Sequence, residues 1–312
     1  MQKYQSKILT LIALLVLGFS TSFAQDKAWK TYPYEIIGGF GPSFMLGELG
    51  GGNGVGRNSI LDLDFLSTRF GGCVGIRKTF RERLSWQATY TMGMLYGSDE
   101  KTEEYFRSDR DISFRTPIQE ISFRLDYKIR KERGGHIYNL RGVRGQRGRT
   151  LSTYCFAGVG LFHFNPKAKL DGDWVALQPI GTEGQNYIST RKPYSLFQVC
   201  IPIGVIAKYT INRRWSISAE AGLRFLFTDY LDDVSTTYAN PDLVAQYDNS
   251  VTDAQAKLAA DPAYVKHCYD NGQYHYYNEQ RGDPYDRDFY MFLMISAHYK
   301  MRQTKDGWPT FK

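Results

Sequence analysis

The sequence predicts an all-β protein: an eight-stranded antiparallel transmembrane β-barrel of the outer-membrane type with long extracellular loops. Three observations lead to this prediction. The chain begins with an export signal, it contains no later apolar run long enough to span a membrane as a helix, and eight segments alternate between apolar and polar residues. A membrane barrel turns the apolar face of each such strand toward lipid and the polar face inward.

Residues 1–24 have the features of a secretory signal peptide. Two lysines precede an apolar run at 8–17, and Ser22-Phe23-Ala24 ends in a small-x-small motif. We expect cleavage before Gln25. Because no cysteine follows the cleavage site, we expect no lipoprotein anchor.

Eight segments alternate with a period of two, which places successive side chains on opposite faces of a strand. In the segment 215–227 the odd positions are apolar from Trp215 to Phe227, whereas Glu220 and Arg224 lie at even positions. Each segment has about the length that a tilted membrane strand needs. The eight predicted strands are 34–46, 70–80, 84–96, 120–129, 153–164, 197–209, 215–227 and 289–299.

Two of these strands carry histidines. In the segment 153–164 we place four aromatic residues on the lipid face, which turns His163 inward. In the last strand the same reasoning turns His298 inward. We interpret both as satisfied interior histidines rather than catalytic groups. The four aromatic residues are Tyr154, Phe156, Phe162 and Phe164.

Loop lengths predict the orientation. The links at 81–83 and 212–214 are tight, whereas those after strands one, three, five and seven are long. Bacterial barrels have short periplasmic turns and long outer loops, so we expect an outer-membrane protein with both termini in the periplasm. The long links are 47–69, 97–117, 165–195 and 228–288, and the last contains a predicted amphipathic helix at 252–265. The implied domains are a periplasmic N-terminal segment at 25–33, the barrel at 34–300 and a periplasmic C-terminal tail at 301–312.

Aromatic residues gather at both ends of the predicted lipid faces, as interfacial aromatic girdles do. A soluble β-sandwich gives no reason for this arrangement. The residues at the predicted periplasmic end are Tyr34, Trp86, Tyr127, Tyr154, Tyr209, Trp215 and Tyr299. Those at the predicted outer end are Phe44, Phe70, Tyr96, Phe164, Phe197, Phe227 and Phe289.

The inward faces carry acids and bases in similar numbers. They could line a pore, but the interior of an eight-stranded barrel is just wide enough for its own side chains. Buried charges also need partners. We therefore expect these residues to pair across strands and close the lumen. They are Glu35, Arg77, Glu120, Arg124, Asp126, Lys128, Lys208, Glu220 and Arg224.

Three carboxylates follow the seventh strand at its outer rim: Asp229, Asp232 and Asp233. They could hold calcium, but no glycine-turned ligand loop follows them. We favour solvated rim acids bridged to lipid-bound cations or to neighbouring loops. The chain has no GxSxG, HExxH or paired CxxC motif. We therefore expect no catalytic residues, no cofactor and no metal, and a non-enzymatic protein.

The four cysteines are widely spaced and indicate core-filling side chains rather than a disulfide framework. The net charge of +7 does not point to nucleic acid in an exported chain. We expect the partners to be outer-membrane lipid, lipopolysaccharide or a periplasmic protein.

One predicted periplasmic link, 130–149, is unusually long and basic. It could contact a periplasmic partner, or it could be a solvated link drawn to anionic groups, and the sequence leaves both readings open. Its basic residues are Arg130, Lys131, Arg133, Arg141, Arg144, Arg147 and Arg149.

Three sequence pieces carry a resemblance: GGFGPSFMLGELGG at 38–51, WVALQPIGTEGQ at 174–185 and FTDYLDDVST at 227–236. With them the chain resembles a Bacteroidetes outer-membrane β-barrel family that includes the type IX secretion system component PorG. The resemblance covers about 33–301. It implies a non-enzymatic subunit that tethers a periplasmic lipoprotein ring to the outer membrane. The alternative is a surface-binding barrel whose 228–288 loop binds an external ligand or lipopolysaccharide.

Overall fold

The computed structural model describes residues 28–46, 49, 68–99, 109–130, 151–248, 250–268, 274–284, 287–304 and 307–311. The predicted signal peptide at 1–24 lies outside the described residues, as does all of the basic link except Arg130. No helix within the described ranges has both the length and the apolar character needed to cross a membrane.

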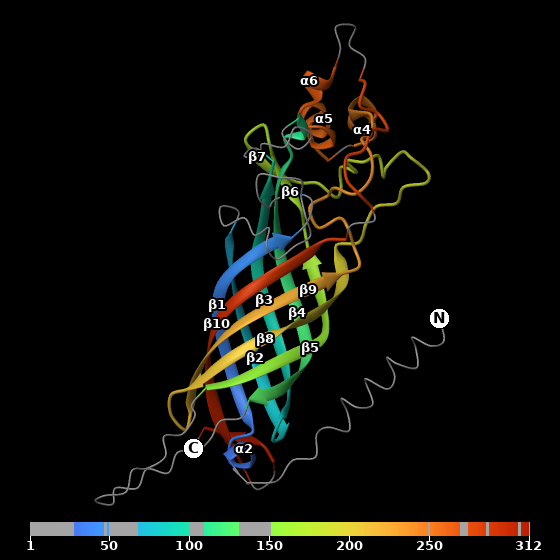
Figure 1. Cartoon of the computed structure of the whole chain (residues 1–312). Coiled ribbons are helices and arrows are strands. Elements are labelled where there is room, and N and C mark those ends of the chain that lie inside the picture. Colours follow the sequence, from blue (N-terminus) through green and yellow to red (C-terminus); the bar gives the residue numbers. More distant parts are fainter. Residues whose placement is uncertain are drawn as a thin grey trace, which may run out of the picture.

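Eight long strands form a closed barrel (Figure 1). They are β1 Tyr34–Leu46, β2 Arg69–Arg81, β3 Leu84–Ser98, β4 Ser113–Arg130, β5 Leu151–Phe164, β8 Phe197–Thr210, β9 Trp215–Leu226 and β10 Phe289–Gln303. Each of these eight strands pairs antiparallel with the next one in this list, and β10 pairs with β1 to close the ring. The predicted eight-stranded antiparallel barrel is confirmed.

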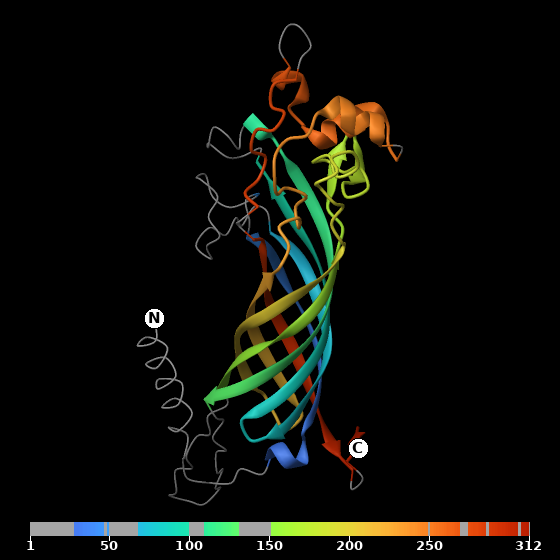
Figure 2. The ribbon, with the colours of Figure 1, turned by 90° about the vertical axis from the view of Figure 1, so that its right-hand side faces the viewer.

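The barrel has a basal end and a cap end. At the basal end Glu82 and Arg83 alone join β2 to β3, and residues 211–214 join β8 to β9. Helix α2, Ala28–Thr31, and strand β11, Pro309–Thr310, lie at the same end (Figures 1 and 2). The described parts of the chain nearest its two termini are therefore on one side of the barrel.

The cap consists of the described residues of 165–196 and 228–288, and it stands beyond the other end of the barrel (Figure 2). It contains the hairpin β6 Lys167–Leu170 and β7 Asp173–Ala176, and the helices α4 Pro241–Tyr247, α5 Asp253–Ala260 and α6 Tyr264–His267. Side chains from the hairpin, α4 and α5 share a small apolar core that includes Leu170, Val244 and Ala256. The cap is thus folded around a core of its own.

Several predicted boundaries differ from the structure. The helix predicted at 252–265 is present as α5 and α6 with a break between them, and Thr252 starts α5 with a capping box. Strand β4 begins at Ser113, inside the predicted loop 97–117, because its partner β3 offers hydrogen bonds as far as Ser98. The predicted loop 165–195 contains the hairpin β6–β7, and β10 continues to Gln303, into the predicted tail.

The predicted outward faces agree with the structure in seven strands, but the assignment for β5 was wrong. Its four aromatic residues point into the barrel, where all four are buried, and His163 lies on the outside against Phe197. The outward face of β5 is aliphatic and includes Val159 and Leu161. Both faces of this strand are apolar, so alternation alone could not distinguish them. The two girdles accordingly lose Tyr154 and Phe164, and Phe44, which was predicted to face lipid, is buried against Leu46 and Met291.

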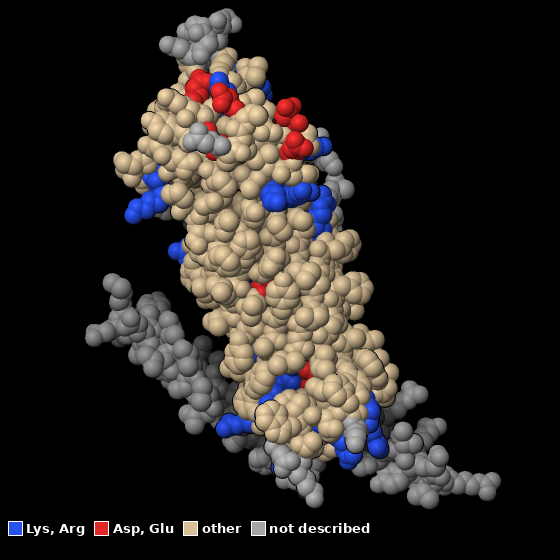
Figure 3. Space-filling view, turned by 180° about the vertical axis from the view of Figure 1, so that it is seen from behind, with Lys and Arg blue, Asp and Glu red and all other residues tan. Residues whose placement is uncertain are grey.

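The outer wall of the barrel is apolar. Its exposed large side chains come from all eight strands and include Phe40, Val74, Ile121, Val159 and Phe197. On the face seen in Figure 3, basic side chains gather at the basal end, charged side chains of both signs lie on the cap, and the middle is almost uncharged. A continuous apolar band of this kind is far larger than the patches that soluble monomers expose.

Candidate functional site

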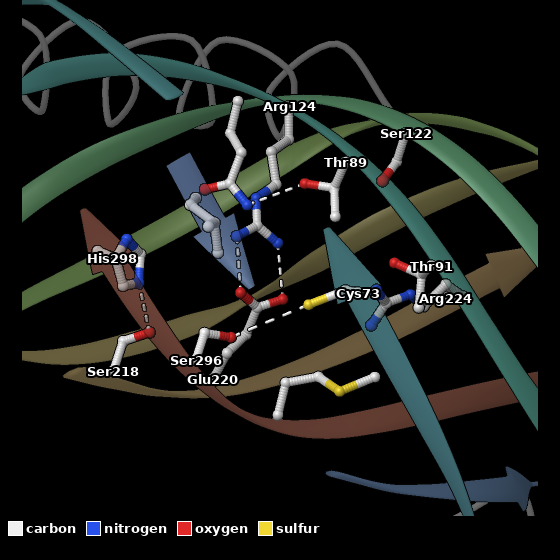
Figure 4. A pocket seen from close by; sticks show the side chains of 13 residues that line it. Cys73, Thr89, Thr91, Ser122, Arg124, Ser218, Glu220, Arg224, Ser296 and His298 are labelled. Carbon is white, nitrogen blue, oxygen red and sulfur yellow. Dashed lines mark hydrogen bonds and ion pairs between the residues drawn. The ribbon is translucent and has the colours of Figure 1, made fainter. Parts of the chain in front are cut away.

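The middle of the barrel is crossed by one bidentate ion pair. Arg124 on β4 donates from Nη1 and Nη2 to the two carboxylate oxygens of Glu220 on β9, each at 2.6 Å (Figure 4). Both residues occupy inward positions of their alternating strands. Asp126, one step further along β4, lies 3.3 Å from Arg124 Nε and 3.2 Å from Nη2 of Arg77 on β2. These four charged side chains come from three strands and neutralise one another inside the barrel.

A second ion pair closes the lumen nearer the basal end. Lys208 Nζ on β8 lies 2.7 Å and 2.5 Å from the two oxygens of Glu35 on β1. His298 on β10 also contacts Glu35, with 3.1 Å between Nδ1 and Oε2, and its Nε2 lies 2.7 Å from Ser218 Oγ. This interior histidine is fully occupied by two partners, which fits a structural role.

A third pair lies toward the cap end. Arg224 on β9 donates from Nε to Glu120 Oε2 on β4 at 3.0 Å, and the Tyr290 hydroxyl on β10 donates to the same oxygen at 2.9 Å. Eight of the nine inward charged residues named from the sequence belong to these three groups. Lys128 lies nearer the basal end, with its Nζ 5.4 Å from the ring centroid of Tyr154.

The inward aromatic residues of β5 cover two of the guanidinium groups. Arg77 lies 4.3 Å from the ring centroid of Tyr154, and Arg124 lies 4.0 Å from that of Phe156. Cation–π contacts of this kind gain strength where water is excluded. They favour the observed orientation of β5, because it places aromatic rings beside two buried cations.

The lumen is filled from the level of the Lys208–Glu35 pair to the cap end. The cavity at the level of Arg124 and Glu220 has a volume of about 10 Å³, which is space for a single water. Toward the cap end an apolar cluster fills the interior; it includes Phe114, Phe162, Phe164 and Phe292. The arrangement offers no continuous aqueous path through the described part of the barrel. Within the described ranges no group of His, Cys, Asp and Glu side chains is placed to hold a metal ion.

The expectation that Asp232 and Asp233 are solvated was wrong, whereas the expected bridging to neighbouring loops is present at Asp233. Both are buried, and Asp229 is partly buried. Asp233 accepts hydrogen bonds from the hydroxyl groups of Thr182 at 2.6 Å and Tyr194 at 2.5 Å. Burial raises the pKa of Asp233 to about 6, against the opposing effect of nearby Arg281. Burial and the neighbouring Asp233 carboxylate raise the pKa of Tyr194 well above its ordinary value.

Glu183 lies at the centre of the same cluster. Its carboxylate accepts from the backbone N–H groups of Ser235 at 2.9 Å and Thr236 at 3.0 Å, and from the Thr236 hydroxyl at 2.6 Å. Arg281 donates to Glu183 Oε1 at 3.1 Å and to the backbone oxygen of Asp233 at 2.6 Å. We call Thr182, Glu183, Tyr194, Asp233 and Arg281 the clasp. The clasp holds together the two long segments that form the cap.

Sequence reasoning did not identify Thr182, Glu183, Tyr194 or Arg281 as site residues. A signal was present in the two short motifs GTEGQ at 181–185 and LDDVST at 231–236, which the clasp brings into direct contact. The predicted basic link cannot be placed, because only Arg130, which is exposed at the end of β4, belongs to the described residues.

A protein-family model matches residues 73–249, more than half of the chain, and is described as Domain of unknown function (DUF6089). The chain belongs to this family. The matched range contains both clasp motifs and ends before Arg281. No curated protein matches the chain.

Three bacterial proteins are among the solved structures that align with most of the chain. Ail of Yersinia pestis covers 86% of this chain and 99% of its own length, with 9% identity and a TM-score of 0.37. Neisserial surface protein A covers 86% and 96%, with 9% identity and a TM-score of 0.39. OprG of Pseudomonas aeruginosa covers 88% and 97%, with 10% identity and a TM-score of 0.34.

Proposed function

We propose that the protein is a non-enzymatic outer-membrane anchor: a closed barrel that holds a folded cap outside the cell and presents a basic end to the periplasm. The filled lumen is the observation that carries the proposal. Three groups of paired charges and an apolar cluster occupy the interior. The barrel can therefore fix the protein in the membrane but provides no path for solutes across it.

The apolar wall supports the membrane placement. Aromatic residues remain at both ends of the outward faces, with Trp215 packed edge-on against Tyr299 at the basal end and Phe225 against Phe289 at the cap end. Interfacial girdles of this kind mark the two headgroup levels of a bilayer. The tight basal turns and the large cap support a periplasmic base and an extracellular cap.

A finer role is that of a PorG-like component of the type IX secretion system, which would tether a periplasmic ring lipoprotein to the outer membrane. The resemblance to the Bacteroidetes barrel family that includes PorG supports this role. The basic basal end supports it as well, because it offers a charged surface on the side where such a ring lies. Arg81, Arg83, Arg130, Arg213 and Lys300 belong to this end.

Two measurements test the proposal. In planar bilayers the wild-type barrel should give no single-channel conductance, and regular ion currents would contradict a closed anchor. In cells, a photo-crosslinking residue at Arg130 should capture a periplasmic ring lipoprotein, whereas the same residue at Val265 on the cap should not. Capture of lipid alone from Arg130 would contradict the tethering role and leave the closed barrel standing.

A second candidate is a surface-binding barrel that recognises an external ligand or lipopolysaccharide through residues 228–288. The folded cap favours it, because residues 228–288 share an apolar core and the clasp with 165–196 and are therefore more ordered than a spacer requires. Replacing residues 228–288 with a short turn distinguishes the two functions. An anchor keeps protein secretion intact without these residues, whereas a surface receptor loses its ligand.

A further inference from the structure

The basal end of the barrel contains an open vestibule of about 530 Å³. Its floor is the Lys208–Glu35 ion pair, and its walls include the aromatic side chains of Trp29, Tyr32 and Tyr154. A volume of this size lies within the range of roughly 300–1,000 Å³ that is typical of ligand pockets. The vestibule therefore has the dimensions of a binding site rather than of a packing defect.

The charges that line the vestibule are strongly biased. Lys128 on β4 and Lys300 and Arg302 on β10 continue the inward faces of their strands below the last internal ion pair, and Arg213 joins them from the β8–β9 turn. The acids in the lining are Glu82 and Glu35, and Glu35 is already paired with Lys208. None of the four cations forms an ion pair with another described residue.

This bias differs from the interior above it. At each higher level a cation meets a carboxylate within hydrogen-bond or ion-pair distance, as Arg124 meets Glu220 and Arg224 meets Glu120. At the vestibule no described carboxylate lies within ion-pair distance of these four cations. A ligand that carries carboxylates would pair these cations as the higher levels are paired. Cations near one another repel, and an anion between them neutralises the repulsion.

We propose that the vestibule binds an acidic peptide segment of a periplasmic partner, its carboxylates on Lys128, Arg213, Lys300 and Arg302. The vestibule is lined by inward side chains, by α2 and by the β8–β9 turn, and not by the apolar outer wall that bilayer lipid would cover. An extended peptide can reach it from the basal end, and the aromatic walls can pack against its backbone and side chains. The inference rests on the proposed function in placing the basal end in the periplasm.

The test measures peptide binding to the purified full-length protein in phosphatidylcholine nanodiscs. The probe is a rhodamine-labelled hexaglutamate peptide, and a hexaglutamine peptide with the same label is its control. We expect the hexaglutamate to bind at least tenfold more tightly, with an affinity that falls as salt is added. Equal binding of the two peptides would overturn the proposal.

Paired variants separate the vestibule from the general charge of the basal end. Lys300→Gln with Arg302→Gln removes two inward cations and should weaken hexaglutamate binding about tenfold. Lys78→Gln with Arg83→Gln removes the same charge from side chains that contact the outward Tyr34 and Tyr127, and should change affinity less than twofold. Equal losses of hexaglutamate affinity in the two double variants would contradict a defined site.

Two further arms complete the test. Lys300→Arg with Arg302→Lys keeps the charges and should keep the affinity, and unchanged gel mobility of the folded barrel in the glutamine variant excludes misfolding as the cause of a loss. Displacement of hexaglutamate by an equal concentration of dihexanoylphosphatidylglycerol would show a lipid headgroup site and overturn the peptide proposal. Ion conductance by the wild-type barrel would overturn the anchor function and leave the peptide result unchanged, so the two proposals can fail separately.

Discussion

Arg124 and Glu220 lie 96 residues apart in the chain and meet through two hydrogen bonds of 2.6 Å in the centre of the barrel. The pair joins β4 to β9, strands that are not neighbours in the ring. It therefore crosses the lumen rather than following the wall. A bidentate pair fixes both side chains in one geometry and leaves little space for ions beside it.

Breaking this pair on one side should destabilise the barrel strongly. Arg124→Leu leaves Glu220 buried without its cation, for which we expect a loss of about 3–5 kcal/mol in the free energy of unfolding. Urea unfolding in detergent micelles, followed by the gel mobility of the folded barrel, measures the loss. The double variant Arg124→Leu/Glu220→Leu should recover most of it. An equal loss in the single and double variants would show that packing, and not the unpaired charge, is responsible.

Removing Arg281 should loosen the cap and leave the barrel folded. Arg281→Ala leaves Glu183 and Asp233 without their shared cation, and we expect the cap to lose about 3 kcal/mol. Limited proteolysis measures the change as faster cleavage within 228–288, with unchanged gel mobility of the barrel. Lys257→Ala is the control, because its ion pair with Asp242 is partly exposed and is worth about 0–1 kcal/mol. Similar cleavage of both variants would contradict a clasp.

The pKa of Asp233 predicts that the stability of the cap depends on pH. The folded state raises this pKa from 3.8 to about 6, so between these values the unfolded chain releases a proton that the folded cap retains. Stability therefore falls as pH rises from about 4 to about 6, and above that range the loss attributable to Asp233 approaches about 3 kcal/mol.

Asp233→Asn tests this prediction, because the amide stays neutral at every pH. Hydrogen exchange at the amides of Ser235 and Thr236 reports opening of the clasp, corrected for the intrinsic pH dependence of exchange. We expect the stability difference between wild type and variant to shift in favour of the variant from pH 4 to pH 7. A difference that is constant over this range would show that the carboxyl does not retain its proton.

The outward face of β5 provides a test of the membrane placement. Val159 is 60% exposed in the middle of the apolar wall, and Val265 is 80% exposed on the cap. Val159→Arg should cost about 2–4 kcal/mol for a barrel folded in a bilayer, whereas Val265→Arg should change stability by less than about 0.5 kcal/mol. Urea titration of both variants in lipid vesicles measures the contrast. Equal stability of the two variants would argue against a lipid-facing Val159.

Much of the fold could be predicted from the sequence because a membrane barrel repeats one rule along every strand. Where the two faces differ in polarity, as in Glu220 and Arg224 against Trp215 and Phe227, alternation identifies the inward side. Strand β5 has no such contrast, and its direction depends on guanidinium groups of β2 and β4 that only the closed barrel places beside Tyr154 and Phe156.

The clasp could not be predicted for a related reason. Isolated carboxylates after a strand suggest a solvated rim, because nothing nearby in the chain neutralises them. Arg281 lies 48 residues from Asp233 and 98 from Glu183, within a segment that has no regular pattern. Side chains that are paired by the folding of long loops leave no periodic signal in the sequence.

Strand β4 contains 18 residues, which at about 3.4 Å each extend about 60 Å. With the tilt of about 40° that is usual for membrane barrels, this length rises about 45 Å, whereas the apolar band of such barrels is about 25 Å tall. In the proposed orientation the surplus lies on the cell exterior, where β4 pairs with β6 and supports the cap. In this orientation the cap would stand clear of the lipid headgroups, where antibodies and other large molecules would meet it before they could reach the membrane.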